Sequence, residues 1–507
     1  MFRKLCGLAL FAALAVSAAA QSAPEVTIDS GKLKGVEENG IVRFLGIPYA
    51  APPVGELRWK APQPVKPWLG VRDASQFGPA CSQTATWVKD SRSEDCLFVN
   101  ITTPNAKSKK PYPVLVWIHG GGLTSGTGSE WGPLGGKALT EKGMILVRIN
   151  YRLGVFGFFA HPELSAESPD HASGNQGFRD QIAALQWVKR NIAAFGGDPN
   201  NVTIAGCSAG GSSVAALTVS PLANGLFQRG ISESGVSGPL PPLAEAEKFN
   251  TDAAAKTVGT SRLADLRKLS TEELLKKDWV TFPVTDGVVL TESPRDSFAK
   301  GHQNKVPVLL GWNADEGVDL AGDFFGAKTI TTATYEAGLH KLFGPQIPPP
   351  ILAQYPGKSD DEAQASAQRL VTDMIGLQHF GWATMRANAK ADPTYLYHYV
   401  HSPVEPPKES PCGYGCKAGH GAEIRFAYGL LWPGERDWSA DDLALQAEML
   451  GYWTNFAKTG NPNGERQSDW KPFDGTPETV KRLGSEAEIK ERGNFTDFRP
   501  YLSMLPQ

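Results

Sequence analysis

The 507-residue sequence has few cysteines, no long cluster of basic residues and, beyond its N-terminus, no long apolar run. A membrane-spanning helix requires about 20 consecutive apolar residues, so insertion of the mature chain into a membrane is not expected. The formal net charge is only −3, and without a basic cluster a nucleic acid is not an expected partner. Internal repeats and low-complexity segments are also absent. These absences predict one continuous folded unit rather than an array of repeats or linked modules.

The N-terminus has the pattern of a secretory signal. Two basic residues precede an apolar run over residues 5–16, and small residues follow as far as Ala20. We therefore expect residues 1–20 to be a signal peptide that is cleaved near Ala20. Residues 21–507 should form a single domain in a secreted or periplasmic protein, and the sequence does not indicate its oligomeric state.

Five cysteines follow the signal segment, an odd number for a protein of an oxidising compartment. A disulfide between Cys81 and Cys96 would close a loop of about 15 residues, which the chain-entropy model values at about 3 kcal/mol. Cys412 and Cys416 enclose Gly-Tyr-Gly, and the two glycines make a short disulfide conceivable. Cys207 is then left as a free thiol.

Short apolar runs alternate with helical patterns along the chain. Runs of this kind suit the buried strands of a parallel sheet, and they cover residues 114–118, 144–149, 202–205, 306–310 and 395–400. Apolar residues at helical spacing over 178–195 predict an amphipathic helix that stops at Gly196. A second helix is expected between Ser439, as its N-cap, and Gly460. The predicted fold class is α/β, with helices covering a mostly parallel sheet.

The segment Gly206-Cys207-Ser208-Ala209-Gly210 lies between a strand pattern and a helix pattern. A serine at the tip of a sharp strand-to-helix turn requires glycines on both sides, because a Cβ there would collide with the reversed backbone. The N-terminus of the following helix favours negative charge at the same place. Ser208 is therefore predicted to be a catalytic nucleophile.

A second glycine-rich segment, His119-Gly120-Gly121-Gly122, follows the predicted strand that ends at Ile118. Consecutive glycines allow main-chain N–H groups to turn inward, as an oxyanion hole requires. The donors predicted for this site are the N–H groups of Gly121, Gly122 and Ala209.

Taken together, these motifs resemble the type-B carboxylesterases, a family within the α/β-hydrolase fold. The resemblance extends over nearly the whole mature chain and includes the segments 44–50, 52–55, 93–97, 150–154, 174–177, 194–199 and 452–457. It implies one large domain in which surface insertions form a gorge above the catalytic residues.

The resemblance also implies the other two members of a catalytic triad. The acid falls at Glu316 in Asn313-Ala-Asp-Glu-Gly317, after the strand 306–310, with Asp315 as the local alternative. The base falls at His420, after the strand 395–400, with His398 and His401 as weaker candidates. The order Ser208, Glu316, His420 is that of α/β-hydrolases.

These assignments predict a serine esterase that acts on a small-molecule carboxylic ester through an acyl-enzyme intermediate. His420 would accept the Ser208 proton, and Glu316 would orient the imidazole. No metal and no cofactor is required. Two other functions remain open: a catalytically inactive, cholinesterase-like binding protein, and an amidase or peptidase on the same fold.

The chain departs from the family at several positions near the triad. Cys207 stands where the family usually has glutamate, and it could be a buried free thiol, a nucleophile itself, or a disulfide partner of Cys412 or Cys416, as in the tannase and feruloyl esterase group. Arg425 stands where proline is common, and with Lys417 it could favour acidic substrates or be merely solvated. Ser234 could hydrogen-bond near the triad or be structural.

Overall fold

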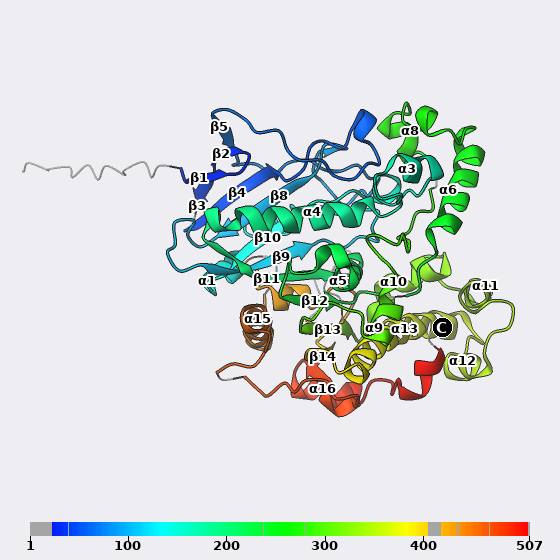
Figure 1. Cartoon of the computed structure of the whole chain (residues 1–507). Helices are drawn as coiled ribbons and strands as arrows, with labels where there is room; N and C mark the ends of the chain where they lie inside the picture. Colours follow the sequence, from blue (N-terminus) through cyan, green and yellow to red (C-terminus); the bar gives the residue numbers. More distant parts are fainter. Residues whose placement is uncertain are drawn as a thin grey trace, which may run out of the picture.

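The computed structural model describes residues 23–38, 40–236, 238–277, 279–403, 417–432, 434, 437–465 and 467–504 (Figure 1). The predicted signal peptide and the proposed Cys412–Cys416 disulfide lie outside these residues. Within the described ranges, no helix combines the length and the apolar character that crossing a membrane requires.

A ten-stranded sheet runs through the middle of the molecule (Figure 1). In spatial order its strands are β15 (Lys481–Leu483), β14 (Thr394–Tyr399), β13 (Val308–Asn313), β12 (Arg229–Glu233), β11 (Gly197–Cys207), β9 (Tyr112–Ile118), β10 (Ile145–Ile149), β8 (Phe98–Thr103), β4 (Ile41–Pro48) and β3 (Val36–Glu38). The strands from β15 to β10 pair in parallel, and β8, β4 and β3 add to one side in antiparallel pairs. The predicted mostly parallel sheet is therefore confirmed.

Two apolar cores lie on opposite faces of this sheet. Along β9, Val114, Val116 and Ile118 belong to one core, and Leu115 and Trp117 belong to the other, as the twofold alternation of a strand dictates. The first core contains α4 (Gln176–Asn191), α5 (Ala209–Val219), α9 (Pro294–Lys300) and α13 (Asp360–Asn388), and the second contains α1 (Lys137–Glu141), α14 (Ile424–Ala427) and α15 (Ala440–Thr459). The strands read as continuous apolar runs because both faces are covered.

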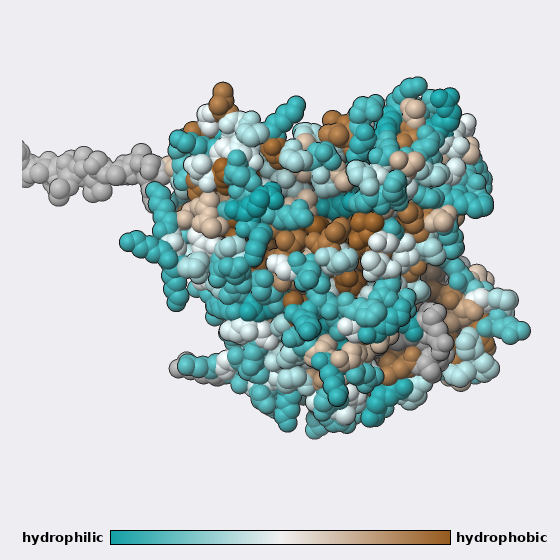
Figure 2. Space-filling model, in the orientation of Figure 1, coloured by the Kyte–Doolittle hydropathy of each residue, from teal (hydrophilic) through white to brown (hydrophobic). Residues whose placement is uncertain are grey.

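Further elements surround this sandwich of helices and sheet. They are β1 (Glu25–Ile28), β2 (Gly31–Lys34), β5 (Val71–Asp73), β6 (Ala80–Cys81), β7 (Arg92–Ser93), α2 (Gly154–Gly157), α3 (Pro162–Glu167), α6 (Leu243–Val258), α7 (Leu263–Leu266), α8 (Thr271–Leu275), α10 (Glu316–Phe325), α11 (Thr332–Phe343), α12 (Pro349–Gln354) and α16 (Glu486–Arg492). Figure 2 shows that polar residues cover most of one face of the molecule, with apolar residues gathered in a band across its middle.

The two helices predicted from periodicity are confirmed, with a refinement at one end. The helix α15 begins after Ser439, whose side chain accepts a first-turn N–H, and it ends at Gly460 with φ 83°. The first predicted helix is divided, because α4 continues as a 3-10 turn over Ile192–Phe195 before it stops at Gly196, where φ is 82°.

The strand predicted over residues 306–310 is displaced toward the C-terminus. It extends to Asn313 because Trp312 and Asn313 find partners inside the protein rather than in water. The Trp312 ring stacks on His398 with ring centroids 4.8 Å apart, and the Asn313 amide donates to the carboxylate of Glu423. These partners come from distant segments, so the apolar run alone does not mark the end of the strand.

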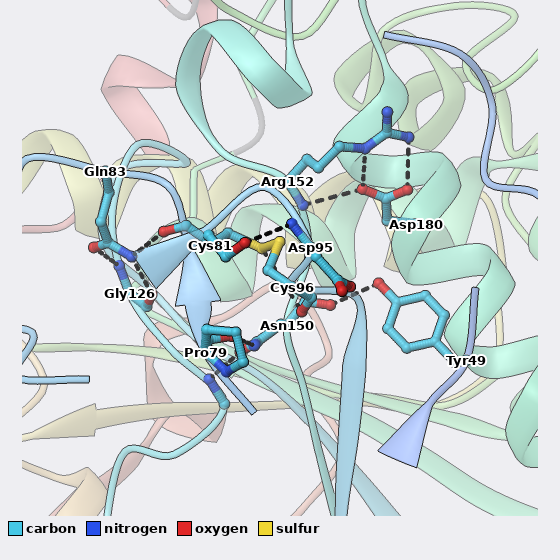
Figure 3. Close-up of a disulfide and its surroundings, with 12 residues drawn as sticks. Tyr49, Pro79, Cys81, Gln83, Asp95, Cys96, Gly126, Asn150, Arg152 and Asp180 are labelled. Atoms are coloured by element: carbon cyan, nitrogen blue, oxygen red, sulfur yellow. Dashed lines mark hydrogen bonds and ion pairs between the residues drawn. A yellow bond between two sulfur atoms is a disulfide. The ribbon is translucent and has the colours of Figure 1, made fainter. Parts of the chain in front are cut away.

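The predicted Cys81–Cys96 disulfide is present, with its two sulfur atoms 2.01 Å apart (Figure 3). Within the loop that it closes, the amide of Gln83 donates to the carbonyl of Gly126 at 2.7 Å and accepts the Gly126 N–H at 2.9 Å. The disulfide loop is therefore attached to the segment that follows the glycine-rich turn.

We predict that replacing both Cys81 and Cys96 with alanine lowers the free energy of unfolding by about 3 kcal/mol, the chain-entropy value for a closed loop of about 15 residues. Urea denaturation of the oxidised proteins measures the difference. A reducing agent should destabilise the wild type and leave the double variant unchanged. Equal stability of the two oxidised proteins would contradict the prediction.

Candidate active site

Ser208 lies at the tip of the turn between β11 and α5, with a φ of 58° in the left-handed region that residues other than glycine rarely adopt. Its N–H donates to the carbonyl of Glu233 at 2.8 Å, which ties the turn to β12. A Cβ on Gly206 would lie 2.6 Å from the carbonyl carbon of Gly210, and a Cβ on Gly210 would lie 2.1 Å from the carbonyl oxygen of Ile118. Both glycines are therefore required by contact between backbones.

The glycine-rich turn after β9 lies directly beside this serine. A Cβ on Gly120 would be 3.3 Å from the Cβ of Ser208. Gly121 and Gly122 have φ values of 99° and 63°, and their N–H groups donate no hydrogen bond within the described residues. Ala209 is the first residue of α5, so its N–H has no acceptor within the helix. All three predicted donors thus remain available to an oxyanion.

His119 holds the start of the glycine-rich turn in place. Its carbonyl accepts the hydroxyl of Tyr151 at 2.8 Å, and the two rings stack with centroids 4.4 Å apart. Burial lowers the pKa of His119 to about 4, although a hydrogen bond to the Gly120 carbonyl opposes the shift. The ring is therefore neutral near neutral pH and supports the turn rather than taking part in proton transfer.

Glu316 and His420 are in direct contact, although they lie 104 positions apart in the sequence. Glu316 is the first residue of α10, and its fully buried carboxylate approaches the Nδ1 of His420 at 2.5 Å. The other carboxylate oxygen accepts the hydroxyl of Ser234 at 2.5 Å and the N–H of Asn313 at 2.8 Å. Because an ionised carboxylate only accepts, Nδ1 carries the proton and Nε2 holds the lone pair.

The competing acid and bases are occupied elsewhere. Asp315 forms an ion pair with Arg492 at 2.7 Å. His398 stacks on Trp312 in the core, and His401 hydrogen-bonds to carboxylates of α15 and α16. None of the three therefore takes the place of Glu316 or His420 in this pair.

Ser208 and Gly421, the neighbour of His420, line the same cavity. The Nε2 of His420 is buried and makes no hydrogen bond within the described residues, so the bond from Ser208 to His420 is not formed in this structure. Such catalytic hydrogen bonds are often long in a free enzyme and shorten when substrate binds. Glu316 and His420 are thus already in contact, and Ser208 faces the cavity that Gly421, the neighbour of His420, also lines.

The environment of His420 favours its charged form. Burial alone would lower the pKa of this imidazole, but the charge of Glu316 and the hydrogen bond to it outweigh that effect, with smaller contributions from Glu423 and Asp319. The pKa of His420 is therefore raised above its ordinary value of 6.5. A proton taken from Ser208 would be held by a base that is stabilised when charged.

The cavity above Ser208 has a volume of about 420 Å³, which suits a small molecule. Its walls are mainly aromatic and aliphatic, and they include Trp87, Trp117, Trp131, Leu134, Cys207, Ile424, Leu430 and Trp432. An acidic and a basic residue, Glu130 and Arg425, join them. In the part of the chain that the structure describes, no cluster of three or more His, Cys, Asp or Glu side chains could hold a metal ion.

A pair of buried glutamates beneath the site was not predicted from the sequence. Glu233 accepts the indole N–H of Trp453 at 2.7 Å and the hydroxyl of Tyr428 at 3.1 Å, while Glu423 accepts from Asn313 and Tyr397. Burial, together with the neighbouring negative charge, raises the pKa of both carboxyl groups. No local pattern in the sequence indicates that these two side chains are buried.

Cys207 is a buried free thiol, which agrees with one of the alternatives considered for it. Burial and then the charges of Glu423 and Glu233 raise its pKa far above the ordinary range. A thiol in this environment stays protonated and is a poor nucleophile. It also sits at the end of β11, one residue before Ser208, which occupies the tip of the turn and is half-buried.

Comparisons with known proteins agree with this geometry. The model of the Carboxylesterase family matches residues 22–498. The chain is similar to the fumonisin B1 esterase of Sphingopyxis macrogoltabida, with 37% identity over 90% of this chain and 86% of that protein. It is also similar to the para-nitrobenzyl esterase of Bacillus subtilis (strain 168), with 36% identity over 92% and 96%. A solved PNB esterase structure matches with a TM-score of 0.74 and 36% identity, covering 89% of this chain and 93% of that one.

The glutamate pair leads to a prediction about stability and pH. Because the folded-state pKa of each carboxyl group is raised, the folded protein binds more protons than the unfolded chain between about pH 4.3, the ordinary glutamate value, and about 7, the pKa of Glu423. The pair therefore becomes more destabilising as the pH rises. Glu233→Gln should raise the melting temperature relative to the wild type by a larger amount at pH 8 than at pH 5.

Glu336→Gln provides the control, since this glutamate is exposed on α11 and should show the same difference at both pH values. Thermal unfolding followed by circular dichroism gives the four comparisons. A difference between Glu233→Gln and wild type that does not grow toward pH 8 would show that ionisation of the pair carries no cost.

Proposed function

Because the chain belongs to the carboxylesterase family and is a carboxylic ester hydrolase of the α/β-hydrolase fold, we propose that Ser208, Glu316 and His420 are its catalytic triad. The observation that carries this proposal is the buried contact between Glu316 and His420, together with a serine at the tip of a strained turn that lines the same cavity as Gly421, the neighbour of His420. Homologues named esterases and the matching solved structures support the reaction class.

In the proposed acylation step, the Oγ of Ser208 attacks the carbonyl carbon of the ester and transfers its proton to the Nε2 of His420. The negative charge that develops on the carbonyl oxygen is stabilised by the N–H groups of Gly121, Gly122 and Ala209. Glu316 holds the imidazole through Nδ1 and stabilises the imidazolium. His420 then protonates the leaving alkoxide, so that an alcohol departs and an acyl-enzyme remains.

Deacylation repeats the same proton transfers with water. His420 removes a proton from a water molecule, which attacks the acyl carbon, and the proton is returned to the Oγ of Ser208 as the carboxylic acid leaves. These steps require only groups of this chain and one water molecule. Neither a metal nor a cofactor enters the proposed cycle.

The proposal also covers the processing and the location of the enzyme. The basic residues, apolar run and small residues of the N-terminal sequence support cleavage of residues 1–20 and a secreted or periplasmic location. We propose residues 21–507 as one catalytic domain. The disulfide between Cys81 and Cys96 is consistent with an oxidising compartment.

The first prediction from this mechanism concerns pH. The free base form of His420 is the reactive one, so kcat/KM should fall as the pH drops through a pKa above 6.5, the value from which Glu316 raises it. Glu316→Gln removes the negative charge and should move this acid limb to lower pH. It should also reduce kcat by about 10³- to 10⁴-fold, as the loss of the orienting carboxylate does in serine hydrolase triads.

Asp323→Gln is the control, because this acidic residue lies on the same helix, α10, but is exposed and is not part of the Glu316–His420 contact. Rates measured between pH 5 and 9 with a para-nitrophenyl ester test both effects. An acid limb that stays at the same pH in Glu316→Gln would show that Glu316 does not set the pKa of the catalytic base.

The second prediction concerns the nucleophile. Purified protein lacking residues 1–20 should hydrolyse para-nitrophenyl esters from acetate to decanoate, and Ser208→Ala should reduce kcat at least about 10³-fold. Cys207→Ala should retain turnover if the thiol is not the nucleophile. Turnover that persists in Ser208→Ala and disappears in Cys207→Ala would reverse the assignment.

A matched aryl ester and anilide separate the remaining reaction classes. An esterase should turn over the ester far faster than the anilide, whereas an amidase or peptidase should cleave both at comparable rates. Absence of turnover of every ester by the folded wild type would favour the inactive binding protein.

A further inference from the structure

The peptide group that joins Gly419 to His420 is hydrogen-bonded on both of its sides. Its carbonyl oxygen, on Gly419, accepts the side-chain amide of Asn313 at 2.7 Å. Its N–H, on His420, donates to the carboxylate of Asp319 at 2.9 Å. Because a peptide group is planar and rigid, two bonds at its opposite edges fix the orientation of the plane. They therefore also restrict the direction in which the His420 side chain leaves the backbone.

Both partners of this peptide group come from the segment that carries the proposed acid. Asn313 is the last residue of β13, and Asp319 lies in the first turn of α10, the helix that begins at Glu316. The backbone N–H of Asn313 also donates to the carboxylate of Glu316 at 2.8 Å. Asn313 thus contacts the acid through its backbone and the segment of the base through its side chain.

A further pair of hydrogen bonds joins the same two segments one position earlier. The N–H of Asp315 donates to the carbonyl of Ala418 at 2.8 Å, and the N–H of Ala418 donates to the carboxylate of Asp315 at 3.0 Å. Directly after His420, the backbone turns through Gly421, whose φ is 73°. Residues 418, 419 and 420 are therefore each bonded to the acid segment, which limits their movement relative to Glu316.

The side-chain amide of Asn313 is itself held in one orientation. Asn313 is fully buried, and its Nδ2 donates to the carboxylate of Glu423 as well as to the carbonyl of Gly419. Both neighbours of this nitrogen are acceptors, and only the NH₂ end of an amide donates. Each of its two hydrogens therefore has one acceptor, and Glu423 fixes the amide that in turn fixes the Gly419 carbonyl.

We propose that Asn313 and Asp319 are positioning residues for the catalytic base, which they hold through the peptide group that precedes it. The inference rests on the proposed function, because it needs His420 to transfer the proton of Ser208. Within the described residues, neither side chain hydrogen-bonds to the imidazole or lines the cavity above Ser208, so each acts through the backbone. A misplacement of about 1 Å in a reacting group can cost about 100-fold in rate.

Asp319 allows a test that leaves the core intact, because its side chain is exposed. Asp319→Ala removes the acceptor and should lower kcat about 10-fold, as expected for loss of a hydrogen bond to a charged group. Asp319→Asn keeps an oxygen acceptor on a side chain of the same length, so it should recover most of this loss. KM should stay near the wild-type value, since Asp319 does not line the described part of the cavity wall.

These rates are measured with para-nitrophenyl butyrate on the alkaline plateau of the pH profile, where His420 is the free base in every variant. Asp323, which is exposed one turn further along α10, provides the matched control. Asp323→Ala and Asp323→Asn should leave kcat unchanged. Wild-type kcat in Asp319→Ala would overturn the proposal. A loss of the same size in Asp319→Asn would also overturn it, because the charge and not the hydrogen bond would then be the cause.

Asn313→Ala tests the other side of the peptide group. It removes the donor to Gly419 and should lower kcat about 10- to 100-fold with little change in KM. Asn304→Ala is the control, since its side-chain amide also donates to two backbone carbonyl groups, at 3.2 Å each, outside this site. Circular dichroism measures the melting temperature of both variants. Equal losses of kcat in the two would contradict a positioning role, and if Asn313→Ala does not fold, the Asp319 variants decide.

Failure of this inference can be told apart from failure of the proposed function. Wild-type kcat in Asp319→Ala and Asn313→Ala, with Ser208→Ala inactive, would overturn the positioning role and leave the serine esterase intact. If the wild type hydrolyses no ester, or if Ser208→Ala keeps full activity, the proposed function fails and this inference fails with it.

Discussion

The close approach of three backbone segments at the nucleophile turn is the constraint on which the site depends. The carbonyl oxygen of Ile118, at the end of β9, would lie 2.6 Å from a Cβ on Gly206 and 2.1 Å from one on Gly210. The glycine-rich turn begins at the next residue, His119, so one contact between β9 and β11 positions both the proposed nucleophile and the proposed oxyanion donors. A side chain at Gly206 or Gly210 would push the end of β9 away from the turn, and would so separate Ser208 from the proposed oxyanion donors.

A group of buried acidic side chains lies beneath this turn. Glu316, Glu233 and Glu423 are all fully buried within a small region, and among the described residues only the contact between Glu316 and His420 gives one of them a partner that can become cationic. A further carboxylate at position 207 would add repulsion to a site that already contains three acids. A neutral thiol at that position fits this arrangement, and it leaves the cavity wall without a negative charge next to Ser208.

Features with local causes were predictable from the sequence, and features with distant causes were not. The turn at Ser208, the helix stops at Gly196 and Gly460 and the disulfide between Cys81 and Cys96 each depend on residues close together in the chain. By contrast, Glu233 is held by Tyr428 and Trp453, which lie 195 and 220 positions away. No periodicity in a short segment reports such partners, so the buried glutamates and the true end of β13 emerged only from the fold.

The distinction between local and distant causes also applies to the residues proposed to react and to those that shape the substrate cavity. Two of the proposed catalytic groups, Ser208 and Glu316, lie just past the ends of β11 and β13, where parallel strands bring them to one edge of the sheet. The cavity walls come from several separate segments, with Trp87 in the disulfide loop, Trp131 after the glycine-rich turn and Trp432 after α14. Arg425 differs from these aromatic residues because it shares one short segment with His420. Its position at the cavity wall therefore depends on the segment that also carries His420, whereas the aromatic walls depend on how the separate loops run.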